Sequence, residues 1–388
     1  MYFKITREII NQAYNNNIQC IQLIKLLDWT ILQGKHIVFA EKEELKNIVG
    51  LKTNDIISAE LHGFNYVLSQ YPTIGAIVDQ LKWHAEFSMN AVSSRDLQTH
   101  TIYININDIP RFDVCKETHL LCENLADINF YRYVLKYYQK INNLSIRTNY
   151  YPILGGGSTT AKVYSAEINE KKALVLCFVD SDQKSPTGTL GDTAKATQKV
   201  DKQKPFNAFL YVLNEVLEVE NLIPLKIYNH YINTLHDDEA KRKIDCINEL
   251  GHNNQQYLNF LDMKKGITLR TLIGTDTSVT YQQDIANHVC PDWAKKNNIL
   301  DMEIQSIFKS PIFLHHTKIK PMVEKYLKSQ ESIVCGLGEN ILENVLANEI
   351  DSLNNIQRED LRSGQLIEYN NIGELLCNWT CCLDEVRS

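Results

Sequence analysis

An apolar run that ends in two aspartates is the clearest sign of chemistry in this chain. The run Ala173–Val179 is followed by Asp180-Ser181-Asp182, so the two carboxylates are one residue apart. A run of this length and composition is typical of a buried, parallel strand. In open α/β sheets, ligands bind beyond the carboxyl ends of the strands. Because two ionised carboxylates repel each other there, the pattern predicts a site for a hard divalent cation.

Further carboxylates follow other predicted strands. Glu123 ends a predicted strand over 118–122, and Glu218 and Glu220 follow a predicted strand over 206–213. If these strands are parallel and adjacent, their acidic residues meet at one edge of the sheet. In an extended segment Glu218 and Glu220 point to opposite faces, so we expect only one of them to face the site. Such an oxygen-rich cluster suits one or two Mg²⁺ ions.

The elements expected around these acids alternate between strand and helix. A helix over 127–139 follows the first strand, and a strand over 146–154 leads into a glycine-rich turn that ends at Ser158. Ser158 is placed to cap a helix that runs to Ile168. The turn lacks the Gly-Lys-Ser/Thr ending of a Walker A loop, so we interpret it as a strand-to-helix turn that lets the backbone approach the site. A turn without any ligand contact is the alternative.

Three regions are expected along the chain. Residues 1–112 and 266–388 show mainly helical apolar spacing, although 101–106 is typical of a strand. The alternating pattern lies between them, over 113–265. We therefore expect an α/β fold with a central, mostly parallel, Rossmann-like sheet domain and helix-rich N- and C-terminal regions.

The composition is that of an ordinary globular protein. The chain has 388 residues and a formal net charge of −7, which argues against a basic coat for nucleic acid. Its ten cysteines are scattered without a Cys-x-x-Cys pair, so we expect free thiols rather than disulfides or a zinc site. There is no apolar stretch of membrane-spanning length and no signal-peptide pattern, so the expected location is the cytoplasm, without membrane contact.

Local basic residues could still contact phosphates. The stretch after the aspartate pair carries Lys184, Lys195 and Lys199, and a second basic stretch runs over 309–328. Clusters of lysine are the residues that neutralise nucleic-acid backbones. A solvated loop and a solvated helix face are the alternative explanations.

The ordered set of acids resembles the Toprim fold. Glu123 ends a strand, and an aspartate follows four residues later at the start of an aromatic-rich helix, as in the first Toprim motif. The glycine-rich turn and the later strand ending in Asp-x-Asp are similar to the rest of that pattern. Glu220-Asn221-Leu222 is similar to the acidic segment of Toprim nucleases from OLD-like and related bacterial defence proteins. The resemblance covers roughly 115–265.

The resemblance implies roles for individual residues. In the family, the first glutamate is a metal-linked acid/base and the Asp-x-Asp pair holds Mg²⁺ or Mn²⁺. This implies that Glu123 is both an acid/base and a metal contact, and that Asp180 and Asp182 bind the metal as part of the catalytic site. Further metal contacts are implied for Asp127 and for Glu220, which the family pattern favours over Glu218.

The activity implied by the resemblance is cleavage of DNA or RNA by a metal-dependent nuclease, as in anti-phage defence systems. Lys184, Lys195 and Lys199 would then contact the nucleic acid. Because Toprim nucleases of this kind are often paired with an ATPase and no ATPase motif is present, a separate ATPase subunit is an implied partner. Whether the chain forms a homo-oligomer stays open.

The sequence departs from the family at two positions. Asn124 stands where the family has glycine, so the turn must accommodate a side chain. Lys184 stands where topoisomerase-type Toprim domains carry a third carboxylate, which favours the nuclease branch. A topoisomerase-like transesterase would also need a tyrosine shortly after Arg95-Asp96, where Leu-Gln-Thr follows.

Other interpretations of the aspartate pair were compared. An EF-hand needs glycine and glutamate where Ser185 and Gly191 stand, and a haloacid-dehalogenase motif needs threonine or valine in place of Lys184. Two alternatives stay open: a glycosyltransferase that holds Mn²⁺ and a nucleotide sugar through Asp-x-Asp, and a non-catalytic Toprim scaffold subunit.

Overall fold

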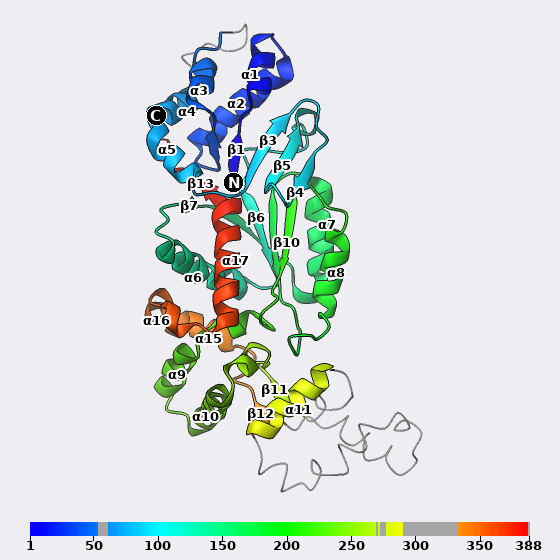
Figure 1. Cartoon of the computed structure of the whole chain (residues 1–388), viewed down its shortest axis with the longest axis vertical. Helices are drawn as coiled ribbons and strands as arrows, with labels where there is room; N and C mark the ends of the chain where they lie inside the picture. The colour runs from blue at the N-terminus through cyan, green and yellow to red at the C-terminus, as the bar shows by residue number, and fades with distance from the viewer. Residues whose placement is uncertain (53–60, 269–270, 272–276, 290–331, 387–388) are drawn as a thin grey trace, which may run out of the picture. The chain divides into compact units, whose positions relative to one another are not determined.

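The computed structural model describes residues 1–52, 61–268, 271, 277–289 and 332–386. The chain folds into two compact units, each built from separated stretches (Figure 1). The first contains residues 1–179, 195–211 and 371–388, and the second contains residues 180–194 and 212–370. The sequence suggested boundaries near 112 and 265 instead.

The first unit begins with a sheet whose strand order is β2-β1-β3-β5-β4. Its strands are β1 (Tyr2–Lys4), β2 (Ile37–Phe39), β3 (His84–Ser88), β4 (Ser94–Asp96) and β5 (Thr101–Asn105). All neighbours pair in parallel except β4, which runs antiparallel to β5 at the edge. The expected strand near residue 101 is β5, whereas the other four strands were not predicted.

Among the described residues of this region, five helices accompany the sheet, in shades of blue in Figure 1. They are α1 (Arg7–Tyr14), α2 (Ile18–Leu32), α3 (Lys42–Val49), α4 (His62–Ser69) and α5 (Tyr71–Val78). One face of the sheet is apolar and buried, with Phe3, Val38 and Phe87 among its side chains. The helices expected for this region are thus confirmed. Apart from the strand near residue 101, the sheet was not predicted.

A second sheet in the first unit has the strand order β10-β9-β6-β8. Its strands are β6 (Thr118–Cys122), β8 (Tyr150–Leu154), β9 (Val175–Val179) and β10 (Ala208–Val212). The central strand β6 is parallel to both β8 and β9, and every residue of β9 is buried. The expectation of an α/β fold with parallel sheets is confirmed by this arrangement.

Helices cover this second sheet on both sides. α6 (Leu125–Ile141) lies on one side and α7 (Thr160–Glu170) on the other (Figure 1). The first residue of α7 follows Thr159, and a 3-10 turn, η3 (Gly157–Thr159), precedes it. Ser158 therefore lies inside this turn and is not the cap that the sequence suggested. α8 (Asp192–Asp201) follows β9 along the chain.

A short antiparallel pair joins the C-terminal end of the chain to the first unit. β7 (Arg147–Thr148) pairs with β13 (Cys381–Cys382). The preceding helix, α17 (Ser363–Thr380), has residues in both units, because the boundary falls after Asn370.

The second unit is mainly helical. Its elements are η4 (Val219–Leu222), α9 (Leu225–Thr234), α10 (Asp238–Asn253), η5 (Gln255–Asn259), β11 (Gly266–Thr268), α11 (Thr277–Val289), β12 (Ser332–Cys335), α15 (Ile341–Asn348), α16 (Ile350–Asn354) and η8 (Arg358–Asp360). β11 and β12 form an antiparallel pair. The basic stretch over 309–328 lies outside the described residues.

Two sequence expectations concern the environment of the protein. Within the described ranges, no helix combines the length and apolar content that crossing a membrane requires. The cysteines of the same ranges carry free thiols, and Cys122 and Cys177 are buried. Both thiols lie in strands, as their apolar neighbours predicted.

Candidate acidic site

The aspartate pair lies in the second unit, against the segment 216–220. Asp180 Oδ1 accepts a hydrogen bond from Val219 N at 3.1 Å. The backbone N–H of Asp182 donates to Leu217 O at 3.0 Å. These two bonds fix both aspartates beside the segment that carries the two glutamates.

The position of the Asp182 carboxylate depends on a neighbouring glycine, Gly191. The backbone of Asp182 is left-handed, with φ at 52°, a conformation that aspartate tolerates better than most residues. A Cβ placed on Gly191 would overlap the Asp182 carboxylate. Gly191 N also donates to Ser181 O at 2.7 Å. Gly191 therefore leaves the space that this carboxylate occupies.

Glu218 and Glu220 share one lysine. Lys264 Nζ lies 2.8 Å from Glu218 Oε2 and 3.1 Å from Glu220 Oε1. The two glutamates are only 4 % and 5 % exposed. Both side chains therefore face the same cation, whereas only one of them was expected to face the site. The reason is that the chain turns into the 3-10 helix η4 (Val219–Leu222) instead of staying extended.

A set of neutral hydrogen bonds holds η4 in place. Asn221 Oδ1 accepts from Glu218 N at 3.0 Å, and Asn221 Nδ2 donates to Leu258 O at 2.8 Å. The hydroxyl of Tyr228 donates to Glu220 O at 2.8 Å. The backbone of the glutamates is therefore fixed by bonds that do not use their carboxylates.

Burial perturbs the charges of this group. Burial first, and then the neighbouring Glu220, raise the pKa of Glu218 to about 8, although Lys264 acts in the opposite direction. Burial also raises the pKa of Glu220, again against Lys264. Burial would lower the pKa of Lys264, but the two glutamates and Asp180 raise it overall. The lysine is therefore held charged, and its charge does not fully compensate the carboxylates.

Asp182 belongs to the same group. Asp182 is exposed as a residue, but partial desolvation of its carboxyl raises the pKa of Asp182, and the charges that act on it include Lys264, which lowers the pKa, and Asp262, which raises it. Asp180, Asp182, Glu218 and Glu220, together with Lys264, are called the acidic cluster below. All five residues lie in the second unit.

The donor set of the acidic cluster is suited to a hard cation. It consists of carboxylate oxygens, which Mg²⁺ prefers. Glu218 Oε1 is buried and has no hydrogen-bond partner among the described residues. In the same ranges, however, no three acidic, histidine or cysteine side chains are already arranged to hold an ion. Lys264 supplies the positive charge in the arrangement seen here.

Glu123 lies in the first unit, beside the glycine-rich turn. Gly155 N donates to Cys122 O at 2.7 Å, and Gly156 N donates to Glu123 O at 3.0 Å. Gly156 and Gly157 have φ values of 71° and 61°, which favour glycine. The turn therefore brings backbone directly alongside Glu123, and a contact between this turn and a bound ligand stays a prediction.

Asp127 has a structural role in the same region. Its Oδ2 accepts from Asn124 N at 2.9 Å, which forms the capping box of α6. Asn124 has an extended backbone, with φ at −132°, so a side chain is accommodated where the family has glycine. Metal binding by Asp127 stays a prediction.

The three predicted nucleic-acid lysines are all exposed. Lys184 follows the aspartate pair in the second unit. Lys195 and Lys199 lie four residues apart on α8, in the first unit, so they share one face of that helix. Their contact with nucleic acid stays a prediction.

Two members of the acidic cluster were missed or set aside by the sequence analysis. Lys264 has no local motif, and only the fold brings it to residues more than 40 positions earlier. Glu218 could have been recognised from Asn221 three residues later, which is the spacing of a capped turn. Comparison of the chain with protein-family models, curated proteins and solved structures finds no match.

Proposed function

We propose that the protein is a divalent-metal-dependent nuclease that hydrolyses phosphodiester bonds of DNA or RNA at the acidic cluster. One observation carries the proposal: two buried glutamates are ion-paired with a single lysine, which also interacts electrostatically with Asp180 and Asp182. Burying two carboxylates beside one cation is unfavourable for stability. Such an arrangement is more typical of a functional site than of a structural ion pair.

Asp180, Asp182 and Glu220 would hold Mg²⁺ or Mn²⁺, with Glu218 beside them. A bound ion of this kind activates water and neutralises the charge of a phosphodiester. The chain itself contributes fixed oxygens, because Asp180 is held by Val219 N and η4 is held by neutral bonds. Lys264 balances the negative charge of the buried glutamates.

Residues outside the acidic cluster complete the proposal. The Toprim resemblance assigns proton transfer to Glu123, and this assignment is tested with its own variant. Lys184, Lys195 and Lys199 would neutralise phosphates of the nucleic acid. An anti-phage role, an ATPase partner and a cytoplasmic location also enter only through the resemblance.

The test is metal-dependent cleavage. The purified chain is incubated with supercoiled plasmid DNA and with structured RNA, in Mg²⁺, in Mn²⁺ and in EDTA. We expect cleavage of at least one substrate, none in EDTA, and a loss of about 100-fold or more in Asp180→Asn, Glu220→Gln and Glu123→Gln. Glu249→Gln, an exposed glutamate on α10, is the matched control and should keep full activity.

Cleavage that persists in EDTA, or that Asp180→Asn leaves unchanged, would overturn the proposal. So would the absence of cleavage by the wild-type protein with either ion.

One observation favours a second candidate, the non-catalytic Toprim scaffold. Lys264 already forms ion pairs with both glutamates, as a purely structural cluster would. In that case Glu220→Gln lowers the free energy of unfolding, and neither Mn²⁺ nor Mg²⁺ raises the melting temperature of the wild-type protein.

A further inference from the structure

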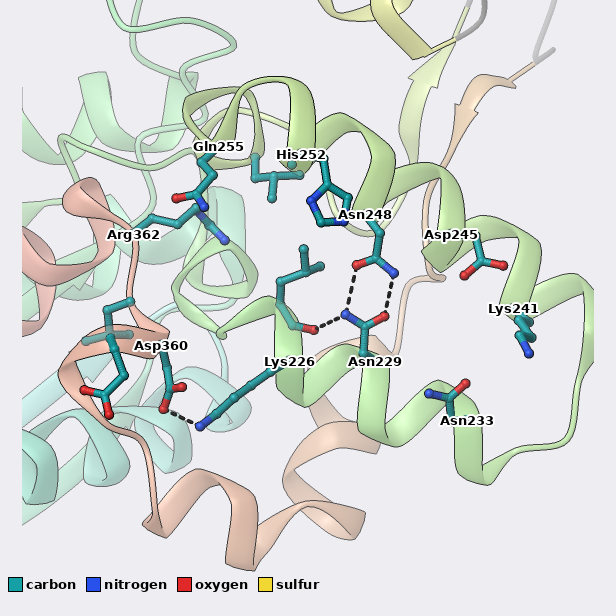
Figure 2. A pocket seen from close by; sticks show the side chains of 15 residues that line it. Lys226, Asn229, Asn233, Lys241, Asp245, Asn248, His252, Gln255, Asp360 and Arg362 are labelled. Atoms are coloured by element: carbon teal, nitrogen blue, oxygen red, sulfur yellow. Dashed lines mark hydrogen bonds and ion pairs between the residues drawn. The ribbon is translucent and has the colours of Figure 1, made fainter.

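A polar groove in the second unit is lined by none of the five residues of the acidic cluster (Figure 2). It has a volume of about 660 Å³ and lies between α9, α10, η5 and the segment 359–362. This volume is within the range of small-molecule pockets. Its lining is dominated by amide and charged side chains, with few apolar groups.

The floor of the groove is a pair of amides. Asn229 Nδ2 donates to Asn248 Oδ1 at 2.8 Å, and Asn248 Nδ2 donates to Asn229 Oδ1 at 2.7 Å (Figure 2). Both residues are half-buried. Asn229 is further fixed by a bond from its Nδ2 to Leu225 O at 3.1 Å. The floor is thus fixed by hydrogen bonds, and it keeps one free N–H, on Asn248 Nδ2, and two amide oxygens that can accept further bonds.

A partly buried arginine lies at one end of the groove. Arg362 Nε donates to Asn259 Oδ1 at 2.9 Å, and its Nη2 donates to the backbone Asn221 O at 2.8 Å. Both acceptors are neutral. A guanidinium has five N–H donors, so these two bonds leave donors available.

The charge of Arg362 has no matching carboxylate. In the described part of the chain it forms no ion pair, and the bonds just given go to amide oxygens. Burial lowers the pKa of Arg362 to about 10. A cation withdrawn from water without a counter-charge is unfavourable. An anionic ligand would supply that counter-charge.

Neighbouring side chains add donors at the same end. Gln255 begins η5, whose last residue, Asn259, is bonded to Arg362, and His252 lies one turn earlier in α10; both side chains are exposed and line the groove. Three carboxylates also line it, namely Asp245, Glu359 and Asp360, and Asp360 is paired with Lys226 (Figure 2). In the described residues none of them is paired with Arg362, so the guanidinium is the group of this groove that an anion would contact.

We propose that this groove binds a small phosphate ester of about nucleotide size. The phosphate would lie at Arg362, Gln255 and His252, because a planar guanidinium matches phosphate oxygens. The hydroxyls or base edge of the ligand would contact the remaining N–H of Asn248 Nδ2 and the amide oxygens of Asn229 and Asn248. No residue of the acidic cluster lines this groove.

The test is calorimetric binding to the full-length protein, without divalent metal. The probes are AMP, GMP, CMP, UMP and ribose 5-phosphate, with adenosine and inorganic phosphate as partial ligands. We expect at least one ester to bind with a Kd below about 1 mM, and both partial ligands to bind about tenfold more weakly or worse.

Two variants locate the binding. Gln255→Ala and His252→Ala remove exposed side chains, so the fold should be unchanged and the affinity should fall about threefold to tenfold. Gln256→Ala, the exposed neighbour that does not line the groove, is the matched control and should bind as the wild type does.

Any of three results would overturn the proposal. They are no ester binding with a Kd below about 1 mM, adenosine or inorganic phosphate binding as tightly as the esters, or Gln255→Ala and His252→Ala binding as tightly as Gln256→Ala. Because metal is absent, these results do not depend on whether the acidic cluster is a nuclease site.

Discussion

Lys264 is the residue on which the electrostatics of the acidic cluster depend. It is the cation shared by two buried glutamates, and it is itself 23 % exposed. Removing one partner of a buried pair leaves the other charge uncompensated, which is strongly destabilising. At the scale of single residues, a variant of Lys264 that removes the charge but keeps an apolar side chain therefore tests how much the charge stabilises the acidic cluster.

We expect Lys264→Met to lower the free energy of unfolding by about 3 kcal/mol or more. Urea denaturation at neutral pH measures this change. The matched control is Lys265→Met, whose side chain is exposed and whose ion pair with Glu339 is long, at 3.7 Å, so its effect should stay below about 1 kcal/mol. Equal effects of the two variants would contradict this account of the acidic cluster.

Some members of the acidic cluster could be identified from residue type and spacing, and others could not. Asp180, Asp182 and Glu220 could be selected from sequence because they follow apolar runs or match a family motif. Lys264 could not be, because its role follows from the position of its amine and not from any local pattern. Glu218 was set aside on the assumption of an extended segment, which the 3-10 turn of η4 replaces.

At the scale of elements, the length of a strand and of its apolar run affected what could be predicted. β9 and β10 lie within longer apolar runs, and β6 ends in three apolar residues before Glu123; the positions of all three were expected to within a few residues. β1 and β2 have three residues each, too few for an alternating pattern to be recognised. Their pairing partners lie far away in sequence, so only the assembled sheet reveals them.

A buried aspartate joins two helices of the N-terminal region. Asp28 on α2 is 5 % exposed, and its Oδ1 accepts from Phe64 N in α4 at 2.9 Å. Burial raises the pKa of Asp28 to about 6, against hydrogen bonds from Phe64 and Gly63 that lower it. Because the folded-state pKa lies above the unfolded value, the ionised carboxyl is unfavourable at neutral pH.

This unfavourable contribution disappears as the pH falls through the folded-state pKa. Between pH 7 and pH 5, Asp28 should therefore add about 1 kcal/mol to the free energy of unfolding, and Asp28→Asn should lack this gain. Urea denaturation of both proteins at the two pH values gives the difference. Asp79→Asn, an exposed aspartate after α5, should follow the wild-type profile. A wild-type profile in Asp28→Asn would show that Asp28 is not perturbed.

At the scale of the whole molecule, each unit is assembled from stretches that are distant in sequence. The first unit needs residues 371–388, and the N-terminal amine of Met1 donates to Cys381 O at 2.6 Å within it. The three consecutive regions suggested by the sequence could not anticipate this, because composition changes along a chain do not report long-range pairing. The α/β class, in contrast, follows from local alternation and is confirmed.

Trp379 tests whether the C-terminal stretch stabilises the first unit. Its ring is fully buried, 5.6 Å from Trp83 and 5.7 Å from Phe209 between ring centroids. We expect Trp379→Ala to lower the free energy of unfolding by about 3 to 5 kcal/mol. Trp29→Ala removes a ring that is 54 % exposed, and its effect should be below about 1 kcal/mol. Comparable effects would argue that residues 371–388 are not part of the core.

The central claim is that the acidic cluster binds a divalent ion, and titration of the metal-free protein with Mn²⁺ in a calorimeter tests it most directly. We expect saturable binding by the wild type, a loss of affinity of about tenfold or more in Asp180→Asn and Glu220→Gln, and wild-type binding in Glu249→Gln. Absence of binding by the wild type, or equal binding by all four proteins, would contradict the claim.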